Sequence, residues 1–477
     1  MVSAASVSIE PSSIGPSTST LDRTTREVPA GGADPARFDW KEVWYPVAYI
    51  EDLDSSQLTS FTLLEEDLVI WWDTHGGQWR VFRDQCPHRL APLSQGRVNE
   101  SGHLECPYHG WAFNGSGHCE QIPQQTEGQR GADSPRACVR SLPVSVAQGL
   151  LFVYPGSPEH APQVAVPTVE PLAADSEDWV CLNTFRDLPY DALTLLENVL
   201  DASHVPFTHH RSVGNRSNAG PVELELLQAD RQGFTGTWKE GPRRGKLGQQ
   251  DTRFIAPNLM WHDLTSEQFG RTMTVVYATP IRKGECRLFA RFPFRFKAKL
   301  PRFFLRVTPR WYSHLGQNAV LEDDQLFLHY QERYLEAVGG GGKHAAKAFF
   351  LPTKADRFVL ALHQWVDGFA ADPFPGQSLP PVQSQEQLLD RYHSHTEHCA
   401  SCRTALGRIR TLKQVALAAG LISLALTPLI AATGQLTVLS GSCITLSTIF
   451  LGAMAGGLTA LESKFFQGRR IPPRNQD

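Results

Sequence analysis

The sequence has no excess of positive charge, few cysteines and, over one long stretch near its C-terminus, no charged residue at all. Its 477 residues carry 45 Lys and Arg against 49 Asp and Glu, a formal net charge of -4, so we expect no nucleic-acid partner, because such proteins usually present a clustered basic surface. Nine cysteines are too few for a disulfide scaffold, and an odd number cannot pair fully within the chain. Metal binding or thiol chemistry is the better prediction for them.

The N-terminal segment also lacks something, namely the apolar core of a secretory signal. Residues 1–36 are rich in Ser, Thr, Pro, Ala and Gly and have no hydrophobic periodicity. We predict a disordered tail, with a transit peptide as the alternative. The composition of the whole chain, 41% hydrophobic and 20% charged, is that of a folded protein of two or three units.

The pattern of short apolar runs divides the rest of the chain. Strand-like runs between turn residues predict an antiparallel β domain over 37–160. Residues 161–395 mix helical periodicity with strands and predict a second domain, of the α+β class. A linker is expected at 396–413, followed by the charge-free segment 414–461 and a basic tail at 462–477.

The charge-free segment predicts a transmembrane hairpin. It holds two apolar stretches, Val415–Thr433 and Leu436–Leu458, each close to the ~20 residues that cross a bilayer core as a helix. Basic residues flank the hairpin at both ends. The positive-inside rule therefore places both ends, and the two preceding domains, on the cytoplasmic side or its organellar equivalent.

A first metal centre is indicated by two tight turns that each supply one Cys and one His. Cys86-Pro87-His88 is followed, after 17 residues, by Cys106-Pro107-Tyr108-His109. Tetrahedral zinc would accept two Cys and two His. One Cys and one His from each turn is instead typical of a Rieske [2Fe-2S] cluster, in which Cys86 and Cys106 hold one iron and His88 and His109 the other.

These motifs carry a family resemblance. The segment CPHRLAPLSQGRV, followed by CPYHGW, resembles the N-terminal half of Rieske non-haem iron oxygenases. The resemblance implies that a ferredoxin or reductase reduces the cluster and that the cluster passes electrons to a mononuclear Fe(II), where O2 reacts. It also implies a helix-grip-like second domain, in which an antiparallel sheet and its helices carry that iron.

A second metal centre is expected around His204 and His209, because non-haem iron enzymes bind Fe(II) through two His and one carboxylate. On a straight helix a five-residue step places two side chains about 140° apart, so the helix must break, and we expect Pro206 to break it. His210 is the competing ligand, and the spacing implied by the resemblance favours His209.

The carboxylate ligand must come from elsewhere in the chain. Glu322-Asp323-Asp324 opens a helical segment of the kind that delivers the Asp in the resembled family. Asp324 is favoured and Asp323 is the alternative. The resemblance also makes Asp201 the bridge to a cluster histidine of a neighbouring subunit in a head-to-tail homotrimer, with Asn198 near the iron. The plain alternative is that Asp201 and Asn198 only cap or solvate a helix.

A Cys-x-x-Cys pair, Cys399 and Cys402, precedes the hairpin. We predict a reversible dithiol switch. The alternatives are two ordinary thiols, or zinc binding together with His393, His395 or His398.

The order of these parts extends the resemblance. A Rieske domain, an iron domain, the thiol pair and two membrane spans together resemble the pheophorbide a oxygenase branch, with its relatives linked to the chloroplast inner envelope and to protochlorophyllide oxidation. This implies a tetrapyrrole or similar large apolar substrate. It also implies a chloroplast envelope, or a cyanobacterial thylakoid or plasma membrane. The competing hypotheses are a membrane-tethered Rieske redox sensor or electron-transfer protein, and an oxygenase of sterols.

Overall fold

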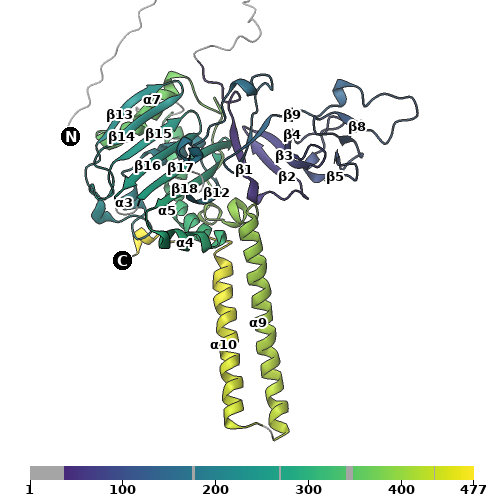
Figure 1. The fold of residues 1–477 in the computed structure, drawn as a ribbon, viewed down its shortest axis with the longest axis vertical. Coiled ribbons are helices and arrows are strands. Elements are labelled where there is room, and N and C mark those ends of the chain that lie inside the picture. The colour runs from purple at the N-terminus through teal and green to yellow at the C-terminus, as the bar shows by residue number, and fades with distance from the viewer. Residues whose placement is uncertain (1–36, 175–177, 268–269, 340–347, 435, 477) are drawn as a thin grey trace, which may run out of the picture.

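The computed structural model places two β-rich domains side by side, and a pair of long helices projects from them (Figure 1). The described residues are 37–174, 178–267, 270–339, 348–434 and 436–476. The predicted tail at 1–36 lies outside this part of the chain.

The N-terminal domain contains three small antiparallel sheets, as the alternating pattern predicts. Their strand orders are β1-β11-β10, β2-β3-β4-β9 and β5-β6-β7-β8. The strands are rich in Val, Trp and Phe, which suit a pleated, half-buried surface. Their bounds are β1 (Tyr45–Tyr49), β2 (Thr59–Leu63), β3 (Glu66–Asp73), β4 (Gln78–Arg83), β5 (Arg97–Val98), β6 (Leu104–Glu105), β7 (Ala112–Phe113), β8 (Cys119–Gln121), β9 (Ser141–Leu142), β10 (Val144–Ala147) and β11 (Leu150–Val153).

The second domain is built on a seven-stranded antiparallel sheet of order β12-β18-β17-β16-β15-β14-β13. Its strands are β12 (Val180–Leu188), β13 (Leu224–Asp230), β14 (Gly233–Trp238), β15 (Gln250–Ile255), β16 (Leu259–Ser266), β17 (Gly270–Arg282) and β18 (Glu285–Phe296). Its helices are α1 (Glu170–Ala174), α2 (Ala192–Leu200), α3 (Val205–Thr208), α4 (Lys299–Val307), α5 (Arg310–Ala337), α7 (Arg357–Gly368) and α8 (Gln385–Leu388).

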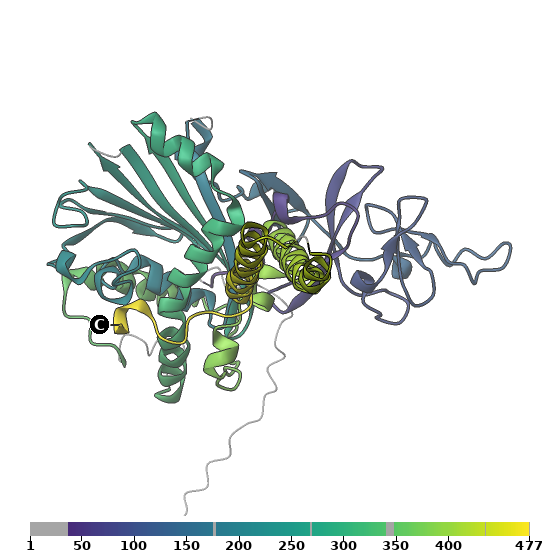
Figure 2. The same ribbon diagram turned by 90° about the horizontal axis from the view of Figure 1, so that it is seen from below.

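The core of the second domain lies between its sheet and its helices (Figure 2). Leu196 of α2 and Phe358 and Trp365 of α7 pack with Val276 and Leu288 of the central strands. Burying each such side chain contributes roughly 1.5–3 kcal/mol, so this layer holds α2 firmly against the sheet. The predicted fold class, an antiparallel β domain followed by a domain of sheet and helices, is confirmed.

The two projecting helices are α9 (Ala400–Ala432) and α10 (Val438–Ser463), which run side by side (Figure 1). Their lengths of 33 and 26 residues and their apolar composition allow each to cross a membrane. Most of 396–413, expected as a linker, forms the first turns of α9, because Ala405, Leu406 and Ile409 are buried against the body.

An ion pair joins the two helices at the ends nearest the body, where Arg410 Nε lies 2.8 Å from Glu462 Oε1. The chain then returns to the second domain. The side chain of Arg474 donates to the carbonyls of Asp323, at 2.5 Å, and Thr208, at 3.2 Å. The last residues therefore pack beside α5 and α3.

Candidate metal centres

The two loops that carry the predicted cluster ligands have the same backbone structure. In each, the N–H of the Cys donates to the carbonyl five residues later, and the Cys carbonyl accepts the N–H four residues later. That fourth residue has a left-handed conformation in both loops, with φ of 61° at Leu90 and 72° at Gly110. A left-handed non-glycine residue costs about 1–2 kcal/mol, so the fold of the first loop is maintained against local strain.

The four predicted cluster ligands meet at the tips of these loops. Cys86 and Cys106 are 1% and 2% exposed, whereas His88 is exposed and His109 is half-buried. The two imidazole rings lie 4.5 Å apart between centroids, and Trp111 stacks on His88 at 4.6 Å. Buried thiols and surface imidazoles suit a Rieske cluster, because the histidine-bound iron then faces an electron partner.

The second centre brings together His204, His209 and Asp324. Their ligand atoms all lie within 4.8 Å of one another. Asp324 Oδ2 is 3.3 Å from Nε2 of His209, and its Oδ1 is 3.9 Å from Nε2 of His204. Two imidazole nitrogens and one carboxylate on one side of a centre form the donor set that non-haem iron enzymes use.

Each imidazole is oriented by a partner on its far nitrogen. Nδ1 of His204 donates to the carbonyl of Asp201 at 2.5 Å, which leaves Nε2 free to face the centre. Nδ1 of His209 lies 3.4 Å from Oδ2 of Asp323, and that carboxylate oxygen also accepts from Ser212 Oγ at 2.9 Å. Such partners fix the tautomer and direction of a metal ligand. The two adjacent aspartates therefore differ in position: Asp324 faces the centre, and Asp323 lies behind His209.

The donor set fits a cation. Asp324 is 5% exposed, and among the described residues no Lys or Arg forms an ion pair with it. Burial raises the pKa of Asp324, and the imidazoles of His209 and His204 oppose this rise. A buried carboxylate without a Lys or Arg partner is costly unless a metal or a charged imidazole neutralises it.

The break in the helix differs from the prediction. Helix α2 ends at Leu200, before the first histidine, and α3 is a separate single turn with His204 at its N-cap and His209 at its C-cap. Pro206 lies within the first turn of α3, where its missing N–H leaves no bond unmade. The two caps of one short turn thus bring the rings together, with centroids 5.2 Å apart.

The remaining predicted site residues lie near the triad or apart from it. Asn198 Nδ2 is 3.4 Å from Asp324 Oδ1. The carboxylate of Asp201 is half-buried, and its Oδ1 accepts from the N–H and hydroxyl of Ser203. Its Oδ2 lies 3.8 Å from Nδ1 of His204, farther than the backbone carbonyl of Asp201 at 2.5 Å. His210 points elsewhere and accepts from the backbone N–H of Arg216 at 3.2 Å.

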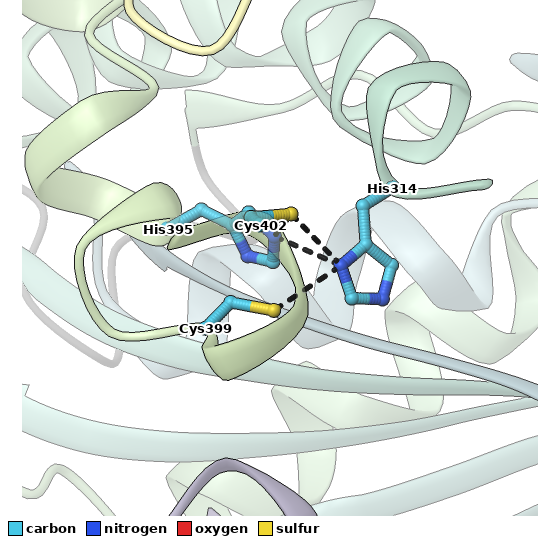
Figure 3. A group of neighbouring side chains, drawn as sticks. All are labelled: His314, His395, Cys399 and Cys402. Atoms are coloured by element: carbon cyan, nitrogen blue, oxygen red, sulfur yellow. Dashed lines mark hydrogen bonds between the residues drawn. The ribbon is translucent and has the colours of Figure 1, made fainter. Parts of the chain in front are cut away.

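The thiol pair lies in a second group of potential ligands. Cys399 and Cys402 are free and fully buried, and they contact His395 and His314 (Figure 3). The two other histidines considered for this pair are held by acids, His393 by Asp390 and His398 by Glu397. The sequence did not indicate His314 as a partner of the thiol pair, because it lies 81 residues from His395 and belongs to no motif.

A cavity of about 1280 Å³ opens beside the triad formed by His204, His209 and Asp324. It is bordered by α2, α3 and strands of the large sheet, and its lining includes all three triad residues. His262 lies in its wall, where burial lowers the pKa of the imidazole to about 4. The site therefore combines a potential metal centre with room for a large molecule.

Comparisons with known proteins identify both domains. Residues 43–144 match the Rieske [2Fe-2S] domain and residues 254–341 match the pheophorbide a oxygenase family. The chain is 37% identical over 437 residues to the chloroplastic pheophorbide a oxygenase of Arabidopsis thaliana, with 85% of this chain and 80% of that protein covered. It is 33% identical to flavonoid 8-hydroxylase 2 of Ocimum basilicum, with 79% and 76% covered. It is 32% identical to protochlorophyllide-dependent translocon component 52 of Arabidopsis thaliana, with 80% and 76% covered.

Solved structures show the same fold. Dicamba monooxygenase bound to 3,6-dichlorosalicylic acid superposes with a TM-score of 0.55 at 24% identity, covering 70% of this chain and 99% of that one. NdmB of Pseudomonas putida CBB5 gives a TM-score of 0.54 at 22% identity, covering 69% and 90%. The predicted cofactors, a [2Fe-2S] cluster and a mononuclear iron, are confirmed at the level of the family. The chain belongs to the pheophorbide a oxygenase family of Rieske non-haem iron oxygenases.

Proposed function

We propose that this protein is a membrane-anchored oxygenase that uses O2 and electrons from a ferredoxin or reductase to oxidise a chlorophyll-derived tetrapyrrole. The observation that carries the proposal is the cavity beside His204, His209 and Asp324, in a chain 37% identical to pheophorbide a oxygenase. Ordinary small-molecule pockets have volumes of about 300–1,000 Å³. A cavity of about 1280 Å³ suits a ligand as large as a macrocycle.

The cavity walls suit a flat, apolar acid. Phe207 and Phe292 contribute aromatic surface, and Arg243 and Arg244 lie at the exposed edge of the lining. Aromatic faces pack well on a planar ring system. Guanidinium groups bind carboxylates in a bidentate fashion, and chlorophyll derivatives that have lost their alcohol tail carry a free carboxylate.

The protein residues have positioning roles in this proposal. Bound at the two centres, the cluster and the iron supply electron storage and oxygen activation. We assign the cluster to Cys86, His88, Cys106 and His109, and the iron to His204, His209 and Asp324. The carbonyl of Asp201 and the carboxylate of Asp323 hold the two imidazoles in the required direction, and Asn198 holds Asp324.

Electron transfer in this proposal runs between subunits of a homotrimer. Within one chain, the sheet β5-β6-β7-β8 that bears the cluster loops and the helix α3 of the iron site lie at opposite ends of the body (Figures 1 and 2). Asp201 is half-buried beside the iron site, so its carboxylate can meet a cluster histidine of a neighbour. A head-to-tail ring would bring each cluster to the next iron.

Mixed oligomers test this assembly. One chain carries Cys86→Ser, which removes the cluster, and the other carries Asp324→Ala, which removes the iron. Each variant alone should be inactive. In an equal random mixture, an intact iron has an intact neighbouring cluster in about one quarter of all sites, so about one quarter of wild-type turnover should return. No recovery in verified mixed oligomers would contradict transfer between subunits.

The hairpin α9–α10 is the proposed membrane anchor. Helix α4 lies on the side of the body from which the hairpin projects (Figure 1) and supports this placement, because four of its large apolar side chains are exposed. These are Leu300, Phe303, Phe304 and Val307. Basic residues alternate with them in the sequence KLPRFFLRV, as in helices that lie in a membrane interface. The membrane is then that of a chloroplast envelope or a cyanobacterium.

Fluorescence quenching tests the orientation. A polarity-sensitive label on Phe304→Cys, in a Cys443→Ser background that removes an exposed thiol, should be quenched by lipids carrying doxyl groups. The same label on Leu227→Cys, an exposed position on β13, is the matched control and should not be quenched. Equal quenching at both positions would contradict the interfacial placement of α4.

Product analysis tests the reaction. The reduced, iron-loaded protein is mixed anaerobically with pheophorbide a, protochlorophyllide, a flavone or a sterol, and isotopically labelled O2 is then admitted. Label in a pheophorbide product supports the proposal. Label only in another product leaves an oxygenase with a different substrate, and the flavonoid 8-hydroxylase relative makes the flavone arm the most informative alternative. Absence of both a third iron and O2 uptake would favour an electron carrier.

A further inference from the structure

A closed group of four potential metal ligands lies outside both iron centres. It consists of His314 from α5, His395 from η7 (Tyr392–Thr396), and Cys399 and Cys402 from the N-terminus of α9 (Figure 3). Each of these side chains is 0 or 1% exposed. Two parts of the chain, 81 residues apart from His314 to His395, thus place two thiols and two imidazoles around one buried point.

The distances within the group are those of a metal coordination shell. Nδ1 of His314 is 3.5 Å from Sγ of Cys399 and 3.4 Å from Sγ of Cys402. Nε2 of His395 is 3.3 Å from Sγ of Cys402 and 3.1 Å from Nδ1 of His314. Around tetrahedral zinc, with bonds of about 2.0–2.1 Å to nitrogen and 2.3 Å to sulfur, neighbouring ligand atoms lie about 3.3–3.8 Å apart. The observed shell is close to this size.

The far nitrogen of each imidazole lies against a backbone carbonyl. Nε2 of His314 is 2.8 Å from the carbonyl of Asn183, and Nδ1 of His395 is 2.7 Å from the carbonyl of Phe185. A carbonyl only accepts, so each far nitrogen is an N–H donor. The near nitrogen is therefore the one with the lone pair in the neutral form of each ring, and both near nitrogens face the same point. Histidine ligands of metals are usually held by a carbonyl or carboxylate in this way.

We propose that His314, His395, Cys399 and Cys402 bind a structural zinc ion. Two thiolates balance a divalent cation, so the occupied site has no net charge and tolerates complete burial. Four protein ligands leave no open position, which is typical of structural rather than catalytic zinc. A nitrogen and sulfur donor set of this kind selects zinc among the common cellular cations. The burial of both thiols also disfavours the dithiol switch predicted from the sequence, because exchange requires access of a second thiol.

The position of the site gives the ion a mechanical role. The ion would connect the base of α9, the first proposed membrane helix, to α5. Helix α5 also carries Asp324, ten residues after His314. Ten residues correspond to about 15 Å along a helix. Asp52 of the first domain accepts the N–H of Ala400 at 3.0 Å and pairs with Arg310 at the start of α5, also at 3.0 Å. The zinc site therefore lies where both domains and the hairpin meet.

Metal analysis of the full-length chain, purified in detergent with its iron centres, tests the proposal. One zinc per chain should accompany the iron. X-ray absorption at the zinc edge should give two sulfur neighbours at about 2.3 Å and two nitrogen neighbours at about 2.0 Å. This measurement uses the wild-type protein and so does not depend on whether a variant folds. It also requires no substrate, so it is independent of the proposed reaction.

Variants assign the zinc to these residues. Cys399→Ser with Cys402→Ser, and separately His314→Ala, should abolish stoichiometric zinc. His393→Ala, His398→Ala and Cys443→Ser are the matched controls and should retain it. Three outcomes would overturn the proposal: a Cys399–Cys402 disulfide in the native protein, no zinc in protein produced with added zinc, or iron bound by these four side chains.

Discussion

Replacement of Asp324 should affect the mononuclear iron centre and leave the [2Fe-2S] cluster unchanged. In the Asp324→Ala variant, the triad loses its only anionic donor, a side chain 5% exposed whose carboxylate lies 3.3 Å from Nε2 of His209. The mononuclear iron should be lost, while the cluster, at the far end of the body, keeps its spectrum. Removing one partner of a buried charged pair costs about 3–5 kcal/mol, which corresponds to a loss of about 10²–10⁴ in iron affinity.

The adjacent residue gives a matched comparison. Asp323 is equally buried, but it contacts Nδ1 of His209 and so acts on the metal through that ring. Removing an outer partner of this kind costs about 10–100-fold in metal affinity. The Asp323→Ala variant should therefore retain more iron than Asp324→Ala at every chelator concentration.

Iron retention decides between the two aspartates. Each variant is equilibrated with increasing chelator, its iron per chain is measured, and electron paramagnetic resonance of the reduced protein verifies the cluster. O2 uptake should fall with the mononuclear iron. If Asp324→Ala keeps this iron and Asp323→Ala loses it, the ligand is Asp323 and the geometric assignment is refuted.

Three further substitutions test other parts of the catalytic domain. Arg186 and Arg391 are buried and lie 2.7 and 2.6 Å from the carboxylate of Glu322. Glu322→Gln leaves both guanidinium groups without their counter-charge and should lower the free energy of unfolding by about 3–5 kcal/mol. An unchanged melting temperature would contradict this. The pKa of His262 is lowered to about 4 in the folded protein, against about 6.5 in the unfolded chain, so its neutral form contributes stability that is lost as pH falls. In denaturant titrations, the wild type should lose about 2 kcal/mol of unfolding free energy relative to His262→Gln between pH 7.5 and pH 5. Parallel pH profiles of the two proteins would contradict this. Arg474→Ala should weaken iron retention about 10-fold without altering the cluster spectrum, and a change confined to the cluster would refute the role of the C-terminal segment.

Local motifs explain why much of the site could be predicted from the sequence. Each cluster loop places its Cys and His within four residues, so spacing alone indicated candidate ligands. The predicted fold class and cofactors agree with the comparisons. His204 and His209 are the two caps of one short turn. The position of the helix break was not predictable, because a proline is accepted in the first turn of a helix as readily as it ends one.

Tertiary packing decides what the sequence left open. Adjacent residues on a helix point about 100° apart, so Asp324 faces the near nitrogens of both histidines while Asp323 contacts Nδ1 of His209. The sequence favoured Asp324 but left Asp323 open. His314 joins the thiol pair only because α5 packs against α9. The same packing turns the expected linker into the buried first turns of α9.

The return of the chain end to the iron site has a consequence for biogenesis. Arg474 is synthesised after both apolar helices, and its guanidinium holds carbonyls next to His209 and Asp324. Chains fold from the N-terminus during synthesis, so the cluster-bearing domain can mature early. In the proposed membrane-anchored enzyme, Arg474 reaches the pocket only after both anchor helices have been synthesised, so this order would delay reaction with dioxygen until the helices can insert.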